Sequence, residues 1–368
     1  MSFGSDVPVL ETKHLLSIPY HSDTHKRMLA QLPFEIVDDI VEYLGFEDLL
    51  SIARVSSAFL VPARRQLFRT TLLVPSLSMV YPESIESMLS SPHLLQYSSR
   101  LVVHCLDSIR QSSIHSLWSR LPTMYRLKIL DVYLDDNDCL RVLSAPESLG
   151  LAREITLKLN CWLTPDLIIS DDPLPVRALF LSVNASNHQI AARIIQKCSQ
   201  SLRKLELDIP KTIDLPLPFL PHLDDFWIYT SYHRGHDPDL TWLFPFLDYH
   251  PTITRLSVES KFTLAVQPPP NLLPNLQFLS ATPVIIERLI PGRAVNDIHA
   301  RYFSRSACCF PDDTMLQSLR QPFVPVTTLK ITTKSHLYNQ DPADIVQALP
   351  KLRKFTLEGP CLQVCLFV

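Results

Sequence analysis

The sequence is poor in glycine, with six among 368 residues, although it holds 31 prolines. Loops that cradle phosphate groups need glycine, because the backbone must approach the ligand without a side chain in the way. The chain accordingly has no G-x-G-x-x-G, no Walker-type loop and no G-x-S-x-G motif. We therefore expect a non-enzymatic protein that has no catalytic residues and binds no cofactor.

Zinc-type spacing of cysteine and histidine is also missing. The eight cysteines form no C-x-x-C, and no Cys/His set has the spacing of a zinc site. The polar stretch SYHRGHDPD at residues 231–239 holds His233, His236, Asp237 and Asp239 but no further ligand. We expect no metal site, interpret that stretch as a solvated loop, and interpret the cysteines as reduced thiols of an intracellular protein.

Long apolar runs and blocks of one charge are absent as well. No run of about 18 apolar residues occurs, and the N-terminus lacks a secretory signal, so we expect no membrane span and a cytoplasmic or nuclear location. The net charge is -3, and the one local basic cluster is Arg64, Arg65 and Arg69. We interpret that cluster as a solvated helix face and expect no nucleic-acid binding.

What the chain does have, near its start, is a short block dense in apolar residues. Leu32, Ile36, Ile40, Val41 and Leu44 have helical spacing, and a second helix is expected from about Glu47 to Ala53. A third helix would follow the possible cap at residues 55–57, although the proline at position 62 predicts either a kink or a start near 61–62. Three such helices carry more apolar residues than their small interior can use.

This block resembles the F-box motif. The pattern L-P-x-E-I-x-x-x-I-x-x-Y-L-x-x-x-D-L-L-x-x-x-x-V-S-x-x-F begins at Leu32, and the resemblance covers residues 29 to 73. It implies docking on the Skp adaptor of a cullin-RING ubiquitin ligase, through the start of the block and the apolar faces of its helices. The adaptor-binding residues that it implies are Leu32, Pro33, Ile36, Ile40, Tyr43, Leu44, Leu49, Leu50, Val55, Phe59, Leu67 and Phe68. The alternative is that the block packs on the rest of the chain.

The remainder of the chain repeats a short apolar pattern. Segments of the form L-x-x-L-x-L start at residues 127, 152, 176, 202, 223, 253, 276, 326 and 352. The interval from 276 to 326 is double the usual one and predicts a worn copy at 294–303; a further copy is expected at 100–103. This period lies in the leucine-rich-repeat range, in which short strands and helices stack into a solenoid.

The repeats depart from the leucine-rich-repeat consensus. The Asn that ties neighbouring turns is found only at Asn160 and Asn184. We predict an α/β fold: a small three-helix F-box at 29–74 and a leucine-rich-repeat-like solenoid of short parallel strands and helices at 75–368. Residues 1–28 are expected to be a flexible extension. A mixed α/β domain of another design is the alternative for the second block.

Residues that alternate with the inward leucines are candidates for target binding. In this register Phe180, Trp227 and Tyr229 would be exposed aromatics, and Glu206 and Lys158 would lie on the same face. A shift of one residue would instead place the aromatics in the core. The expected function is substrate recognition for an SCF-type ubiquitin ligase, with the repeats binding an unknown protein substrate. The alternative is a non-ligase F-box/adaptor scaffold whose repeats bind proteins.

Overall fold

The computed structural model describes the chain in segments. These are residues 32–55, 57–73, 96–105, 119–134, 154–159, 169, 171–184, 186–209, 215–229, 242–259, 268–269, 271–302, 313–322, 324–333, 342–359 and 362–367. The predicted extension at 1–28 and the loop at 231–239 lie outside them. The chain divides into two compact units, Met1–Arg69 and Thr70–Val368.

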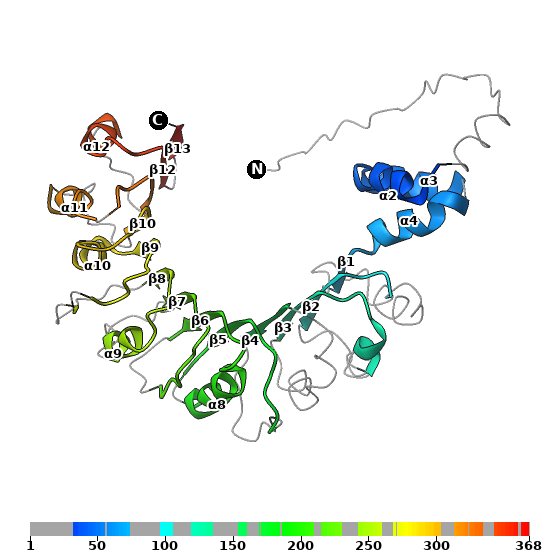
Figure 1. Ribbon diagram of the computed structural model, residues 1–368, viewed down its shortest axis with the longest axis horizontal. Coiled ribbons are helices and arrows are strands. Elements are labelled where there is room, and N and C mark those ends of the chain that lie inside the picture. Colours follow the sequence, from blue (N-terminus) through cyan, green and yellow to red (C-terminus); the bar gives the residue numbers. More distant parts are fainter. Residues whose placement is uncertain are drawn as a thin grey trace, which may run out of the picture. The chain divides into compact units, whose positions relative to one another are not determined.

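The described part of the first unit consists of three helices, α2 (Phe34–Glu42), α3 (Phe46–Val55) and α4 (Ser57–Leu67) (Figure 1). They confirm the three helices expected from the sequence. A start of the third helix near residues 61–62 is contradicted, because α4 begins at Ser57 and contains Pro62. The proline cannot donate a backbone hydrogen bond, but it is buried in the unit, where its ring adds packing.

The second unit is a sheet of short strands in sequence order. Within the described residues the order is β1 to β13 without a crossover; β1 to β12 run parallel, and β13 pairs antiparallel with β12. The strands are β1 (Thr70–Leu73), β2 (Arg100–Cys105), β3 (Ile129–Leu134), β4 (Glu154–Leu159), β5 (Ala178–Ser182), β6 (Lys204–Asp208), β7 (Asp225–Tyr229), β8 (Arg255–Glu259), β9 (Phe278–Ala281), β10 (Asp297–Tyr302), β11 (Thr328–Thr333), β12 (Lys354–Gly359) and β13 (Leu362–Phe367).

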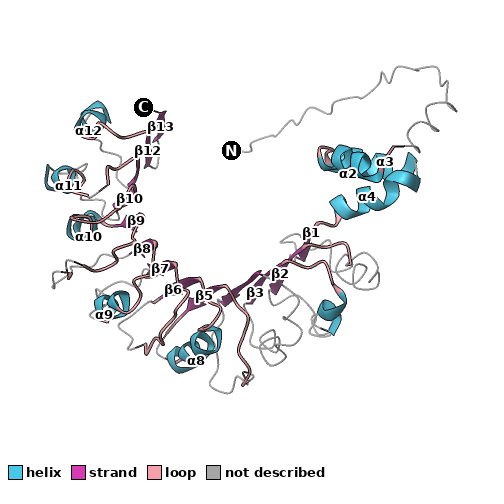
Figure 2. Ribbon diagram, viewed as in Figure 1, coloured by secondary structure: helices cyan, strands magenta, loops and turns pink. Residues whose placement is uncertain are grey.

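Helices cover one face of this sheet, as Figure 2 shows. In the described segments they are the 3-10 turn η1 (Leu121–Thr123) and the helices α8 (His188–Cys198), α9 (Leu243–Asp248), α10 (Pro283–Leu289), α11 (Asp313–Ser318) and α12 (Pro342–Ala348). Two of them, α8 and α12, lie in linkers between strands, where a solenoid of short strands and helices places its helices. No helix of the described residues is long and apolar enough to cross a membrane.

The strand positions confirm the predicted repeats. Each strand that follows a predicted start begins two residues after it, as Ile129 follows 127 and Lys354 follows 352. The worn copy at 294–303 is β10, in which Ile298 and Ala300 are buried where a leucine pair is usual. The copy at 100–103 is β2. The sheet nevertheless begins at Thr70, so the predicted first block of 29–74 includes a strand of the second unit.

The core lies between the sheet and its helices. Along β6 the side chains of Leu205 and Leu207 are buried, whereas those of Lys204, Glu206 and Asp208 are on the other face. The same alternation runs through β4, β5 and β7, so the buried apolar residues form one continuous cluster along the unit. This is the stacking that a single strand-helix unit needs to bury its apolar face.

Neighbouring repeats are tied by residues other than a ladder of asparagines. Asn184 hydrogen-bonds within its own turn, where its Oδ1 accepts from the backbone N–H groups of Ser186 and Asn187. Ser201 Oγ instead donates across repeats to the carbonyl of Leu174 at 2.9 Å. Thr252, Asn275 and Arg293 make similar bonds to backbone carbonyls 21 to 29 residues away in sequence. Different side chains thus do the work of the consensus Asn.

Candidate protein-binding surfaces

The interior of the first unit uses fewer residues than the sequence pattern supplies. Beside the buried Pro62, the core cluster of its described residues is Val37, Val41, Leu49, Phe59 and Ala63. Of the predicted adaptor-binding residues, Leu49 and Phe59 therefore lie in the interior, at 4% and 2% exposure, and we assign them to the core. Each helix must bury one face against the other two, and on α4 that face is the one that carries residues 59 and 63.

Other predicted residues remain on the surface of the first unit. Ile36 and Ile40 are 44% and 38% exposed, Tyr43 is 90% exposed, and Pro33 is exposed as well. The inward face of α2 belongs instead to the valines at 37 and 41, one residue further along the helix. Half-buried positions are Leu32, Leu44, Leu50, Leu67 and Phe68, and the side chain of Val55 lies outside the described residues.

Sequence reasoning missed part of this surface. Phe34, Phe46 and Val61 are also exposed apolar side chains of the same unit. Phe34 and Phe46 occupy positions that the quoted motif leaves variable, and Val61 lies beyond the end of the motif, so the motif by itself could not have found them. Together, Pro33, Phe34, Ile36, Ile40, Tyr43, Phe46 and Val61 form what we call the apolar surface. Exposed apolar side chains gathered on one small unit are typical of a protein-interaction surface.

Two ion pairs join α2 to the end of α4 and to Arg69, which lies two residues after α4 ends. Arg65 lies 3.2 Å from Asp38, and Arg69 lies 2.9 Å from Glu42. Asp38 and Glu42 lie four residues apart on α2, and the two arginines lie four residues apart in sequence. The Arg65 guanidinium also lies 4.7 Å from the centroid of the Phe34 ring. Two members of the arginine cluster noted in the sequence are therefore engaged within the unit.

The second candidate surface is the sheet face that points away from the core. In the register of β4 to β7, Lys158 pairs with Phe180, Phe180 with Glu206, and Glu206 with Trp227. Tyr229 lies two residues further along β7 and hydrogen-bonds to Glu206. The structure thus brings the five predicted target-binding residues together on one face, and the alternative register is contradicted by the burial of Phe226 and Ile228 instead.

Partial burial alters the acidity of two groups on this face. Burial, followed by the nearby charge of Glu206, raises the pKa of Tyr229, which therefore stays protonated and able to donate. Burial also raises the pKa of the Glu206 carboxyl, although the Tyr229 hydroxyl and the Lys204 ammonium act against the shift. The Tyr229 hydroxyl and the Glu206 carboxyl therefore form a hydrogen-bonded pair on the sheet face.

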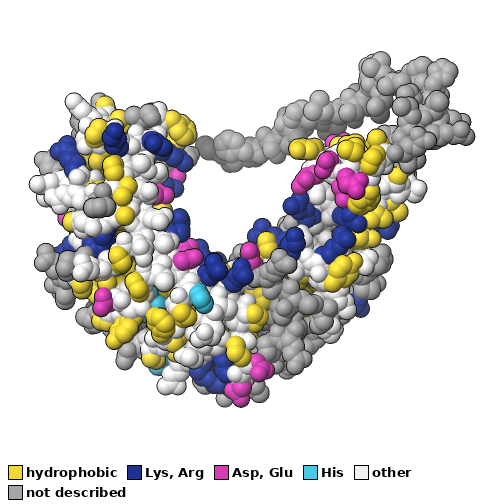
Figure 3. Space-filling model, viewed as in Figure 1, with side chains coloured by type: hydrophobic (Ala, Val, Ile, Leu, Met, Phe, Trp, Pro, Cys, Tyr) yellow, Lys and Arg dark blue, Asp and Glu magenta, His cyan; other side chains and the backbone are white. Residues whose placement is uncertain are grey.

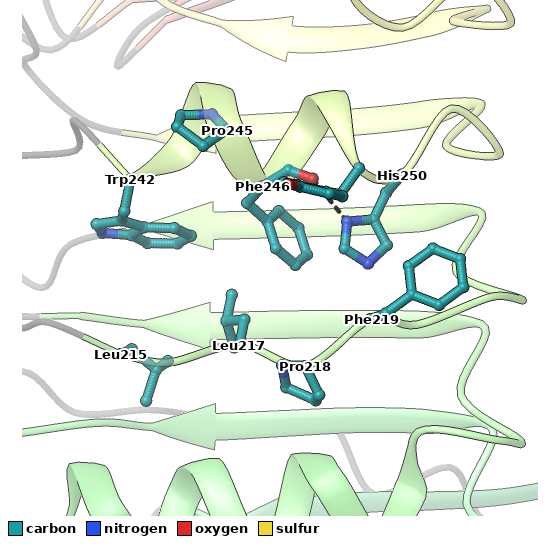
Figure 4. Close-up of a pocket in the computed structure, with 9 residues that line it drawn as sticks. Leu215, Leu217, Pro218, Phe219, Trp242, Pro245, Phe246 and His250 are labelled. Atoms are coloured by element: carbon teal, nitrogen blue, oxygen red, sulfur yellow. Dashed lines mark hydrogen bonds between the residues drawn. The ribbon is translucent and has the colours of Figure 1, made fainter.

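A pocket of about 380 Å³ opens between the 215–219 segment and α9 on the helical side of the repeat unit (Figure 4). Its walls are leucine, proline and aromatic side chains, together with His250. The His250 Nε2 accepts the backbone N–H of Leu220 at 2.9 Å, and its Nδ1 lies 2.6 Å from the carbonyl oxygen of Phe246. Burial lowers the pKa of His250, so the imidazole is neutral and both ring nitrogens are engaged. The pocket is a packing feature rather than a site with reactive groups.

No group of three or more His, Cys, Asp or Glu side chains that could hold a metal ion occurs in the described segments. Cys198 is a buried free thiol whose pKa is raised by burial, and Cys365 is a free thiol at the surface. Neither of these two is placed beside a base or a second thiol by any contact of the described structure.

Comparison with known families identifies the first unit. Residues 29–60 match the model of the F-box domain. The match spans α2, α3 and the start of α4, which are the elements that carry most of the apolar surface. No curated protein matches the chain. The chain therefore carries an F-box domain followed by a long, mostly parallel sheet consistent with leucine-rich-repeat-like units.

Proposed function

We propose that this chain is the substrate-recognition subunit of an SCF-type cullin-RING ubiquitin ligase. The F-box domain docks on a Skp-type adaptor, and the adaptor links the chain to the cullin-RING core. The repeat unit binds a protein target through the face that carries Lys158, Phe180, Glu206, Trp227 and Tyr229. The chain itself performs no chemistry; it raises the concentration of the target near the ubiquitin-loaded enzyme.

The observation that supports adaptor docking most strongly is the division of α2 into two apolar faces. Val37 and Val41 satisfy the interior of the F-box unit, yet Ile36, Ile40 and Tyr43 remain exposed on the same helix. Covering three such side chains is worth several kcal/mol, at about 25 cal/mol per Å² of apolar surface removed from water. An adaptor helix laid against this face would supply that cover.

The test is co-purification with the adaptor. The wild-type chain and the variants Ile36→Asp and Ile40→Asp would each be co-expressed with the Skp-type adaptor and captured by a tag on the adaptor. We expect the wild type to be retained and both variants to be lost. Val284→Asp is the matched control, because Val284 is similarly exposed, at 41%, but belongs to α10 in the repeat unit.

Circular dichroism would check that every variant is folded. Retention of both aspartate variants at the wild-type level would contradict docking through α2. The cullin is then assayed in the captured complex. A complex with adaptor but without cullin would favour the alternative that the chain forms a non-ligase scaffold with the adaptor. We expect the cullin to be present.

A further inference from the structure

Cations line the edge of the sheet where the strands begin. Six cations from β2 to β8 lie at the first position of a strand or immediately before one. We call this set the basic strip; it consists of Arg100, Lys128, Arg177, Arg203, Lys204 and Arg255. All except Lys204 are exposed. Figure 3 shows Lys and Arg side chains gathered along the inner rim of the repeat unit, over its middle strands.

Carboxylates accompany the strip, and two of them are more buried than the arginines beside them. Arg100 Nη2 lies 2.7 Å from Asp131 Oδ2, with side-chain exposures of 50% for the arginine and 7% for the aspartate. Arg255 is likewise more exposed than its partner Asp225, with side-chain exposures of 48% and 15%. Glu154, beside Arg177, is the exposed exception, and Asp224 is half-buried. Among the residues that the structure describes, the outermost side chains of the strip are therefore mostly positive.

Aromatic rings hold two of these cations in place. Lys204 Nζ lies 5.2 Å from the Phe180 centroid and 4.6 Å from the Trp227 centroid. The Arg255 guanidinium lies 4.2 Å from the centroid of Phe278, its register partner on β9. A cation fixed against a ring and a carboxylate loses little further freedom when it binds a second anion, so less of the binding energy is spent on ordering it.

The arrangement of the strip favours one kind of anion. Adjacent strands lie about 4.8 Å apart, so the six steps from β2 to β8 span roughly 29 Å. An extended chain covers that distance with about nine residues at roughly 3.3 Å each. A single phosphate group needs cations that converge on one point, whereas these cations are spread along a line and match several separate carboxylates.

We propose that the basic strip binds an unmodified acidic segment of the target, an extended chain of about nine residues rich in Asp and Glu that crosses strands β2 to β8. This inference rests on the proposed function, because it names the class of target that the repeats recruit. The aromatic side chains of Phe180 and Trp227, adjacent to the strip, contact the apolar residues of the same segment. Electrostatic attraction of this kind speeds the encounter and selects the partner by charge.

The test measures peptide binding to the purified full-length chain by fluorescence anisotropy. Four labelled 12-residue peptides share one Gly/Ser spacing and differ in four positions, which hold Glu, Gln, Lys or phosphoserine. We expect the Glu peptide to bind at least 10-fold more tightly than the Gln and Lys peptides. We also expect its affinity to fall at least 5-fold when the salt concentration rises from 50 to 300 mM, because exposed charges are screened.

Paired variants locate the binding surface. Arg177→Gln combined with Arg203→Gln removes two exposed cations of the strip, and we expect it to weaken Glu-peptide binding at least 5-fold. Arg193→Gln combined with Lys351→Gln removes the same charge from α8 and from the turn before β12, outside the strip, and should leave binding unchanged. Three outcomes would overturn the proposal. They are equal affinities for the Glu, Gln and Lys peptides, binding of the phosphoserine peptide alone, and an equal loss of affinity in both double variants.

This test is independent of adaptor docking. A chain that binds the adaptor but shows no preference for the Glu peptide would lose only the acidic-target inference. A chain that prefers the Glu peptide but fails to bind the adaptor would lose the ligase assignment and keep the strip as a binding surface.

Discussion

The ammonium group of Lys204 lies 4.6 Å from the ring centroid of Trp227, on the sheet face that points away from the core. Asp225 holds both residues. Its Oδ2 lies 3.6 Å from Lys204 Nζ, and its Oδ1 accepts the Trp227 indole N–H at 2.6 Å. One carboxylate therefore positions both the cation and the ring. Its removal should lower the free energy of unfolding and also weaken target binding.

Asp225→Asn tests that arrangement. The substitution keeps the size and an acceptor oxygen but removes the charge that Lys204 and Arg255 share. We expect a loss of about 1.5 kcal/mol in the free energy of unfolding, as is typical of a hydrogen bond to a charged, mostly buried group. Urea denaturation measures it. Glu154→Gln, which removes an exposed partner 3.7 Å from Arg177, should cost less than about 0.5 kcal/mol. Equal unfolding midpoints for wild type and Asp225→Asn would refute the expectation.

Arg293 should contribute strongly to stability, because its hydrogen bonds join neighbouring repeats. It is 4% exposed, and its guanidinium donates to the carbonyls of Leu272, Leu289 and Pro269 at 2.6, 2.6 and 2.9 Å. Arg293→Met leaves these acceptors without their donor, so we expect a loss of about 2 kcal/mol or more. Arg320→Met removes one bond, to the Ala348 carbonyl, and should cost about 1 kcal/mol or less. Thermal unfolding compares the two, and a larger loss in the control would contradict the assignment.

The two apolar faces of α2 should respond differently to truncation. Val37 is 3% exposed, so Val37→Ala removes two methyl groups from the F-box interior at a cost of about 2 kcal/mol. Ile36→Ala acts on a side chain that is 44% exposed and should cost less than about 1 kcal/mol in the isolated chain. Hydrogen exchange of the α2 amides reports both. If Ile36→Ala lowered the protection of the α2 amides more than Val37→Ala did, then Ile36 rather than Val37 would belong to the interior.

The stability of the repeat unit should fall in mild acid through His299. Burial, followed by the charges of Arg301 and Lys330, lowers the pKa of His299 from 6.5 to about 4. Between pH 6.5 and about 4, the histidine is therefore protonated in the unfolded chain but neutral in the folded chain. The stability that is present above pH 6.5 is consequently lost as the pH falls toward 4. His299→Gln should flatten this part of the profile of unfolding midpoint against pH. Parallel profiles for wild type and variant would exclude His299 as a source of the slope.

The repeat pattern was readable from sequence because it is local. In the segment that starts at Leu202, the third and fifth residues after it, Leu205 and Leu207, are both buried, so a period of two along one strand predicted which side chains face the core. Even the worn copy at β10 was located by spacing alone. The strand β1 was missed, because Thr70–Leu73 carries no full repeat pattern and becomes a strand through its pairing with β2.

The division of the F-box helices was harder to read for a related reason. Ile36 and Val37 are adjacent and both apolar, and helical spacing allows either to face inward. In the packed unit Val37 faces inward, and Phe59 lies in the same interior cluster. The motif located the three helices correctly but could not divide their apolar residues between core and surface.

The sequence by itself determined the three-helix block and the period of the strands, since each depends on spacing within one element. It left two registers open for Phe180 and Trp227, and the structure decided between them by burying Phe226 and Ile228. Only the tertiary structure decided that Arg100 covers Asp131, that Lys204 lies against Trp227, and that cations from separate repeats form one strip. Those contacts join residues that are far apart in the chain, and the register between strands, which no local pattern encodes, is what brings them together.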